Sequence, residues 1–324
     1  MNNKVTTIMY HYVRNITESR YPAINGIEVD DFRGQIGFLK KHYNFITMEQ
    51  LIDSIHSDYV LPPKAVLLTF DDAYTDHFMH VFPILVENEI QGSFFIPAKT
   101  VLDHKLLDVN KIHFILSSCR DKNVLVKEIL DWVEKTRNLY NLKSNDYYLN
   151  KSFISNRYDS KEVVFVKRML QVELNEALRA TIVDDLFCKY VGISESIFAK
   201  ELYLSIDQIK TMLRFGMHIG AHGYDHYWLG SLSSKKQYQE IGSSFEFLKN
   251  LGVREEYMTM CYPYGSYNQD TIDILTESNC KLAFTTEVRV ANIHTDSKFT
   301  LPRLDTNDFP FERNAALNNW FDKI

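Results

Sequence analysis

The chain has 324 residues, of which 45% are hydrophobic, 24% charged and 13% aromatic, a composition that is ordinary for a globular protein and argues against long disorder. Its formal net charge of −6 at pH 7 argues against binding of nucleic acid through bulk positive charge. The longest apolar stretches, such as Ala65 to Phe70, are far shorter than the roughly 20 residues that a membrane-spanning helix needs. We therefore expect no nucleic acid partner and no membrane span.

In chain order, the N-terminal residues Met1–Lys4 lead directly into a β-like segment, without the apolar region and cleavage site of a secretory signal. The cysteines lie far apart and form no CxxC pair, so we expect reduced thiols in a cytoplasmic protein rather than a disulfide or zinc framework. These four residues are Cys119, Cys188, Cys261 and Cys280.

Short apolar or β-branched segments alternate with helical patterns, which is typical of α/β architecture with parallel strands. We expect strands at Val5–His11, Ala65–Phe70, Gly92–Pro97, Met217–Ala221, Met258–Tyr262, Leu282–Thr285 and Phe299–Leu304. Helices are expected at Phe32–His42, Met48–Ile55, Asp76–Asn88, Ser205–Phe215, Lys235–Leu251 and Thr271–Ser278. Seven strands with intervening helices favour a barrel over an open sheet, but periodicity alone does not distinguish the two. In the helix Lys235–Leu251 the spacing predicts a buried face formed by Tyr238, Ile241, Phe245 and Leu248.

Residues from about 103 to 204 interrupt this alternation, because they contain helical patterns and no convincing strand. Within them, Asn141–Asp159 is rich in polar residues and is expected to form a long loop. The simplest interpretation is a mainly helical insertion at about 103–204, within a single domain that spans residues 1–324. Such an insertion would either pack over one rim of the barrel or provide a surface for a homo-oligomer.

Two adjacent carboxylates, Asp71 and Asp72, follow the apolar segment Ala65–Phe70. They therefore lie at the carboxyl end of a buried strand, where parallel α/β folds place their active sites. Adjacent carboxylates repel each other, so the pair usually requires a cation or the protonation of one member. The alternative is a helix N-cap, because aspartate favours that position and a helix is expected to begin near Tyr74–Asp76.

Two histidines, His222 and His226, follow the strand expected at Met217–Ala221. At this spacing their imidazoles can point to one position, and an aspartate would complete a set of two nitrogens and one oxygen, as in catalytic zinc sites. A pair of histidines without a metal is the alternative. His218 is expected to be structural.

Three further groups follow other strands. The turn Tyr262–Gly265 could form a wall of a site and offer the Tyr264 backbone N–H to a developing oxyanion, or it could be only a rigid turn. His11 ends the first strand and could equally be a half-buried structural histidine, whereas Arg303 and Asp305 end the last strand and could form a surface ion pair. Five such groups at the carboxyl ends of different strands together favour one active site.

This combination resembles the polysaccharide deacetylase family (carbohydrate esterase family four, the NodB-homology domain) over roughly residues 1–100 and 205–305. Its T-F-D-D motif is complete as Thr69–Asp72, its H-x3-H motif is His222 to His226, and its R-x-P-Y-G motif is present as Cys261–Gly265, with cysteine replacing the arginine. The segment Met9–Val13 resembles the circularly permuted branch that includes poly-N-acetylglucosamine deacetylases. The resemblance implies an α/β fold, a distorted (β/α)7-type barrel with the large helical insertion.

The resemblance also implies the chemistry, a metal-dependent de-N-acetylase that hydrolyses the acetamide of an N-acetylated sugar in an envelope, capsule or other glycan pathway. Asp72, His222 and His226 would bind one divalent metal ion, with Zn²⁺ expected first and Mn²⁺, Co²⁺ or Ni²⁺ also tolerated. Asp71 would be the general base, and His11 would be the general acid, as in the permuted branch.

Three roles complete the expected site. The Tyr264 backbone N–H would be a second oxyanion donor, Arg303 would act on Asp71 in place of the motif arginine missing at Cys261, and Asp305 would hold His11 in one tautomer. Without an export signal, we expect a nucleotide-linked, lipid-linked or soluble sugar substrate. The alternatives are a metal-dependent amidohydrolase for a non-sugar amide and a catalytically inactive sugar-binding homologue, which the missing motif arginine would explain.

Overall fold

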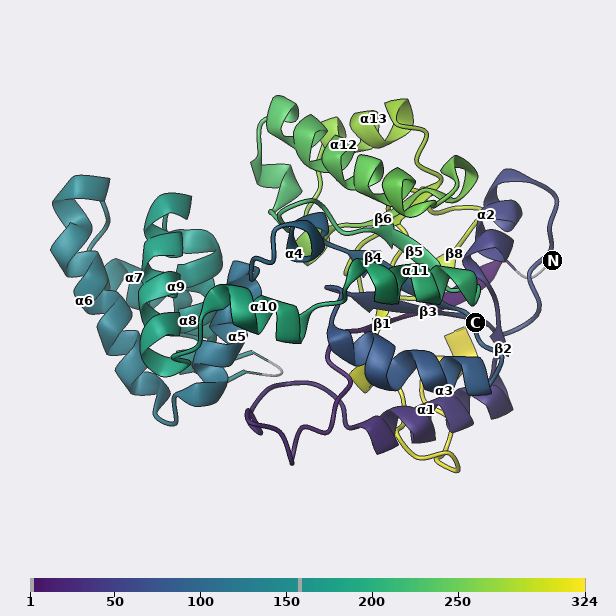
Figure 1. The fold of residues 1–324 in the computed structure, drawn as a ribbon, viewed down its shortest axis with the longest axis horizontal. Coiled ribbons are helices and arrows are strands. Elements are labelled where there is room, and N and C mark those ends of the chain that lie inside the picture. The colour runs from purple at the N-terminus through teal and green to yellow at the C-terminus, as the bar shows by residue number, and fades with distance from the viewer. Residues whose placement is uncertain (1–2, 157–158, 324) are drawn as a thin grey trace. The chain divides into compact units, whose positions relative to one another are not determined.

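The computed structural model describes residues 3–156 and 159–323, which divide into two compact units (Figure 1). The barrel unit combines the N-terminal segment to Arg14, Gly26–Lys105, and the chain from Ala199 onwards. The helical unit combines Asn15–Asn25 with Leu106–Phe198. That the helical unit is an insertion into a single domain remains a prediction.

The barrel unit is built on a mixed sheet in which six parallel strands are neighbours in the order β7-β6-β5-β4-β3-β1. These strands are β1 (Lys4–Tyr10), β3 (Ala65–Asp71), β4 (Gly92–Ile96), β5 (His218–Ala221), β6 (Thr259–Cys261) and β7 (Leu282–Phe284). Short strands extend the sheet: β2 (Asn44–Phe45) pairs with β3, and β8 (Ala291–Asn292) and β9 (Leu304–Asp305) pair with β1. Because Leu301 also bridges to β7, the segment before β9 connects the two ends of the strand array. The structure thus has the expected barrel-like α/β fold.

The strands are buried on both faces, and all seven residues of β3 are inaccessible to solvent or nearly so. Uninterrupted apolar segments of this kind are typical of parallel strands covered by helices. The register aligns the carboxyl ends of neighbouring strands, since Tyr10 pairs with Phe70, and Ile96 with Ala221. Residues that follow these strands therefore emerge at the same edge of the sheet.

Helices lie on both sides of the strands, with α1 and α3 on one side and α12 and α13 on the other (Figure 1). The helices of this unit are α1 (Val29–His42), α2 (Met48–His56), α3 (Phe82–Glu87), α4 (Ala98–Leu102), α11 (Ile206–Arg214), α12 (Ser234–Leu251) and α13 (Gln269–Glu277). The expected buried face of α12 is correct for Ile241, Phe245 and Leu248 but wrong for Tyr238, which is 60% exposed. Polar Gln237 and Glu240 are buried there instead, because they bond to neighbouring loops.

Two other predicted elements of this unit differ from the structure, and each of them contains a proline. The helix expected at Asp76–Asn88 is a π-helical turn, η1 (His77–Val81), followed by α3, with Pro83 at the start of α3. The strand expected at Phe299–Leu304 is reduced to an isolated bridge at Leu301 and to β9, because the intervening Pro302 has no N–H to donate.

The helical unit is built of helices, as the helical patterns of this segment predicted. Its elements are α5 (Asp108–Ser118), α6 (Lys122–Tyr140), α7 (Asn145–Ser152), α8 (Lys161–Arg168), the π-helical turn η2 (Met169–Glu173) and α9 (Glu176–Tyr190), and α10 (Glu195–Leu202) follows. The expected loop over Asn141–Asp159 is wrong where α7 forms, because the Ser144 side chain caps the backbone N–H of Tyr147. In residues 3–156 and 159–323, no helix is both long and apolar enough to cross a lipid bilayer.

Candidate active site

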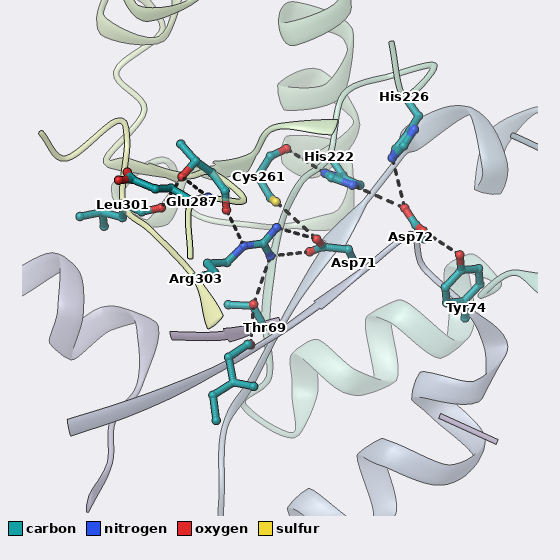
Figure 2. A network of polar contacts seen from close by, with 12 residues as sticks. Thr69, Asp71, Asp72, Tyr74, His222, His226, Cys261, Glu287, Leu301 and Arg303 are labelled. Atoms are coloured by element: carbon teal, nitrogen blue, oxygen red, sulfur yellow. Dashed lines mark hydrogen bonds and ion pairs between the residues drawn. The ribbon is translucent and has the colours of Figure 1, made fainter. Parts of the chain in front are cut away.

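Three potential metal ligands meet beyond the carboxyl ends of β3 and β5 (Figure 2). Asp72 follows β3 directly, and His222 follows β5 directly, while His226 lies four residues further on. All three side chains are buried, with 2–8% of each residue exposed. Nε2 of His222 lies 3.5 Å from Oδ1 of Asp72, and Nε2 of His226 lies 3.3 Å from the same oxygen. The structure therefore brings together the ligand set that was expected.

This arrangement fits a divalent cation. Although it is buried, Oδ1 of Asp72 makes no hydrogen bond to any residue that the structure describes, which is costly unless another partner binds it. Two ligand atoms about 2.0–2.1 Å from one tetrahedral Zn²⁺ lie about 3.3–3.4 Å apart, close to the two distances observed here. In addition, Nδ1 of His222 donates to the Cys261 carbonyl at 2.8 Å, so Nε2 is the ring nitrogen left to bind a metal.

The backbone around these ligands adopts uncommon conformations. Asp72 has φ of 74°, Ala73 has φ of 57° and His226 has φ of 57°, all in the left-handed region that residues other than glycine rarely adopt. Such conformations persist where the surrounding structure enforces them, and they are frequent at functional sites. The helix N-cap interpretation of Asp71 and Asp72 is wrong, because Asp71 ends the strand, Asp72 lies in this turn, and the helical residues begin only at Thr75.

The loop from His222 to His226 is held by its neighbours on α4 and α12. The backbone N–H of Lys99 donates to the Tyr224 carbonyl at 3.0 Å, and its ammonium group contacts both oxygens of Asp225 at 2.6 Å. Glu240 accepts a hydrogen bond from the backbone N–H of Asp225 at 2.9 Å. Asp225 is therefore occupied by an ion pair, and the loop that carries both imidazoles is anchored at its centre.

Asp71 makes a buried ion pair with Arg303 (Figure 2). The guanidinium donates from Nη1 to Oδ1 at 3.0 Å and from Nη2 to Oδ2 at 2.8 Å. Nε of Arg303 also donates to the Thr285 carbonyl, and Nη1 to the Thr69 hydroxyl. The structure thus places Arg303 on the carboxylate where it was expected, and Cys261 lies beside the pair with Sγ 3.5 Å from Oδ2.

Burial and the neighbouring charges determine which acidic groups of the site are ionised. Burial alone would raise the pKa of Asp71, but the charges of Arg303 and His222 and the hydrogen bonds from Arg303 lower it to about 2. Burial would likewise raise the pKa of Asp72, but the two imidazoles that face it hold that pKa well below its usual value. Both carboxyl groups are therefore ionised at neutral pH. Burial raises the pKa of Cys261, so its thiol is neutral there.

His11 follows β1 at the same edge of the sheet and is half-buried. Its imidazole is close enough for its positive charge to lower the pKa of both Asp71 and Asp72. The backbone carbonyl of His11 accepts a hydrogen bond from Nε2 of His77 at 2.9 Å. His77 is completely buried, and burial lowers its pKa to about 4, so a neutral ring anchors the segment that carries His11.

Tyr264 lies in the turn η5 (Pro263–Gly265), next to the second histidine ligand candidate. Its ring packs edge-on against His226 at 4.7 Å between centroids and stacks on Trp228 at 4.4 Å. The turn requires Gly265, since φ is 68° and a Cβ atom there would lie 2.3 Å from the Thr286 hydroxyl. The structure places Tyr264 beside the three ligand candidates, where a wall of the site was expected.

The structure does not bring Asp305 to His11. The Asp305 carboxylate accepts hydrogen bonds from the backbone N–H and the side-chain amide of Asn307, and it caps the short 3-10 helix η6 (Thr306–Asp308). This local capping interaction holds the Asp305 carboxylate on its own turn. The contacts of the described residues include none between Asp305 and His11, so the expected role of Asp305 is not carried forward.

One residue of the site was missed in the sequence. The Tyr74 hydroxyl donates to Oδ2 of Asp72 at 2.7 Å (Figure 2). Tyr74 reaches Asp72 because two consecutive left-handed residues reverse the chain between them, and no pattern in the sequence reveals that conformation. His218, expected to be structural, is buried and bonds to the Thr259 hydroxyl at 2.8 Å.

Comparisons with known proteins indicate which family this chain is similar to. A family model described as polysaccharide deacetylase matches residues 58–131 and 156–283. The YxkH protein of Bacillus subtilis (strain 168) is 29% identical over 100 residues, which are 31% of this chain and 35% of that protein. The chain therefore matches about a third of the length of this curated relative.

Similar solved structures share the fold. The Streptococcus pyogenes deacetylase PplD in complex with acetate has a TM-score of 0.58 and 18% identity, with 93% of this chain and 92% of that chain covered. IcaB from Ammonifex degensii has a TM-score of 0.58 and 20% identity, with 95% and 94% covered. A de-N-acetylase from Aggregatibacter actinomycetemcomitans has a TM-score of 0.55 and 16% identity, with 97% of each chain covered.

Proposed function

The chain belongs to the polysaccharide deacetylase family, and we propose that it is a metal-dependent de-N-acetylase that converts the acetamide of an N-acetylated sugar to an amine and acetate. One observation carries this proposal. An unpartnered carboxylate oxygen and two imidazole nitrogens converge next to a second carboxylate that an arginine keeps ionised.

Asp72, His222 and His226 are the proposed ligands of one divalent cation, with Zn²⁺ as the leading candidate. When bound, such a cation polarises the acetyl oxygen and lowers the pKa of a nearby water from 15.7 toward about 7, which a base as weak as Asp71 requires. A ligand set with one carboxylate and two imidazoles also suits Mn²⁺, Co²⁺ and Ni²⁺.

Asp71 is the proposed general base. It adjoins Asp72 in the chain, and its pKa of about 2 keeps it ionised at neutral pH, so it can accept the proton of the attacking water. Arg303 holds both of its oxygens, and this fixes the direction of the carboxylate. We assign to Arg303 the role of the motif arginine that Cys261 replaces, which favours an active enzyme over an inactive homologue.

His11 is the proposed general acid. Release of the sugar amine requires a proton on a poor leaving group, and a histidine supplies one near neutral pH. His11 lies at the same edge of the sheet as Asp71 but comes from a different strand, so base and acid are separate groups. The backbone N–H of Tyr264 is the proposed second donor to the developing oxyanion.

The experiment that tests this function measures acetate released from N-acetylhexosamine and its oligomers, together with the amine formed. We expect equal amounts of both, loss of turnover after chelation, and recovery with Zn²⁺. Asp71→Asn is the control for contaminating activity. Release of acetate or ammonia only from non-sugar amides such as cyclic ureides would contradict the sugar substrate, and binding of sugar with no turnover would contradict the enzyme.

A further inference from the structure

The two oxygens of the Asp72 carboxylate have different partners. Oδ1 faces the imidazoles of His222 and His226, whereas Oδ2 accepts the hydrogen bond from the Tyr74 hydroxyl at 2.7 Å (Figure 2). All of these groups are buried, so no solvent competes for either oxygen. The arrangement divides the carboxylate into an oxygen left for a cation and an oxygen already occupied.

Tyr74 is itself held from both sides. Its ring stacks on Tyr12 with 4.0 Å between centroids and lies parallel to Tyr203 at 6.3 Å. Because a carboxylate can only accept, the Tyr74 hydroxyl proton points to Asp72. The two aromatic contacts hold the ring that carries this hydroxyl.

The backbone explains why such an anchor is needed. Asp72 and Ala73 both adopt left-handed conformations, so the Asp72 side chain leaves an irregular turn rather than a strand or helix. The Ala73 carbonyl accepts from the Leu204 backbone N–H at 2.8 Å, which fixes the turn but not the carboxylate. Of the contacts described for the Asp72 side chain, the Tyr74 hydroxyl gives the only hydrogen bond shorter than 3 Å.

We propose that Tyr74 is a positioning residue that restricts Asp72 to coordination through Oδ1 alone. This inference rests on the metal site of the proposed function and extends it to a residue outside the ligand set. A carboxylate can bind a cation through one oxygen or through both. With Oδ2 occupied by Tyr74, the three protein groups supply three ligand atoms, which leaves positions for water and an acetyl oxygen.

The test measures the affinity of the metal-free full chain for Zn²⁺ and Co²⁺ by competition with a chromophoric chelator. Tyr74→Phe removes the hydroxyl and keeps the ring, and we expect its affinity to fall about 10- to 100-fold, the usual effect of losing a partner of a metal ligand. The visible absorption of bound Co²⁺, which reports coordination number, should also change.

Tyr43→Phe is the matched control, since the Tyr43 hydroxyl is also buried but has no hydrogen-bond partner among the described residues. The affinity of this variant for Zn²⁺ and Co²⁺ should equal that of the wild type. Wild-type affinity and an unchanged Co²⁺ spectrum for Tyr74→Phe would overturn the inference. If Tyr74→Phe does not fold, a structure of the wild type with bound Zn²⁺ decides, and coordination of the metal through both oxygens of Asp72 would overturn the inference. Failure of the wild type itself to bind either metal would instead contradict the proposed function.

Discussion

Removing the guanidinium of Arg303 leaves Asp71 as an unpaired charge in the core. Arg303 is 1% exposed and contacts both oxygens of Asp71, so Arg303→Met removes one partner of a fully buried pair and keeps most of the side-chain volume. Loss of one partner from a buried pair costs about 3–5 kcal/mol. At about 2–4 °C per kcal/mol for a domain of this size, the midpoint of thermal unfolding should fall by roughly 6–20 °C.

The pH dependence of this stability effect follows from the pKa of Asp71. The ordinary pKa is 3.8 and the pKa in the folded protein is about 2, so the ion pair contributes about 2 kcal/mol to the free energy of unfolding above pH 4. This contribution is lost as pH falls from about 4 to 2. In Arg303→Met the largest of the influences that lower this pKa is lost, so the pKa of Asp71 should rise. Protonation then relieves the unpaired charge at low pH, so the difference in stability between variant and wild type should narrow from pH 7 to pH 4.

The assay is thermal unfolding of the metal-free protein at pH 7 and pH 4. Arg33→Met is the matched control, because Arg33 contacts Glu87 at 3.4 Å with both side chains more than half exposed, and such pairs contribute below about 1 kcal/mol. The double variant Arg303→Met/Asp71→Asn, which removes both charges, should recover part of the loss. A midpoint for Arg303→Met no lower than that of Arg33→Met would refute the reasoning.

The remaining predictions concern catalysis. In Arg303→Met, the acidic limb of the pH profile of kcat/KM should move to higher pH, because Asp71 is then protonated at a higher pH; an unmoved limb would exclude Asp71 as the base that Arg303 controls. Asp71→Asn should reduce kcat by about 10²–10⁴-fold while the bound metal, quantified by elemental analysis, stays at the wild-type level. His11→Ala should lower kcat by a similar factor, whereas a near-wild-type rate would exclude His11 as the acid.

The sequence predicted best those structural features that a single physical rule determines. Continuous apolar segments such as Ala65–Phe70 fit a strand buried on both faces, and the structure extends this strand by one residue. Residues after parallel strands emerge at one edge, so a site at that edge could be predicted, whereas the choice of Asp72 as the partner of His222 came from the resemblance to the family motifs.

Interactions that depend on register or on local competition were harder to predict. Arg303 meets Asp71 across 232 positions in the chain, which only the closure of the strand array determines. Asp305 was expected to hold His11 in one tautomer, but its own turn offered a nearer donor in Asn307. Tyr74 was missed because its contact with Asp72 requires two consecutive left-handed residues, for which neither residue type has a strong preference.

A crystal of the protein grown with Zn²⁺ and measured at the zinc absorption edge tests the central claim most directly. We expect one anomalous peak per chain, at about 2.0–2.2 Å from Oδ1 of Asp72 and from Nε2 of both His222 and His226. Oδ2 of Asp72 should remain on the Tyr74 hydroxyl, and Asp71 should remain on Arg303. A peak elsewhere, or imidazoles that point away from Asp72 with no peak between them, would contradict the account.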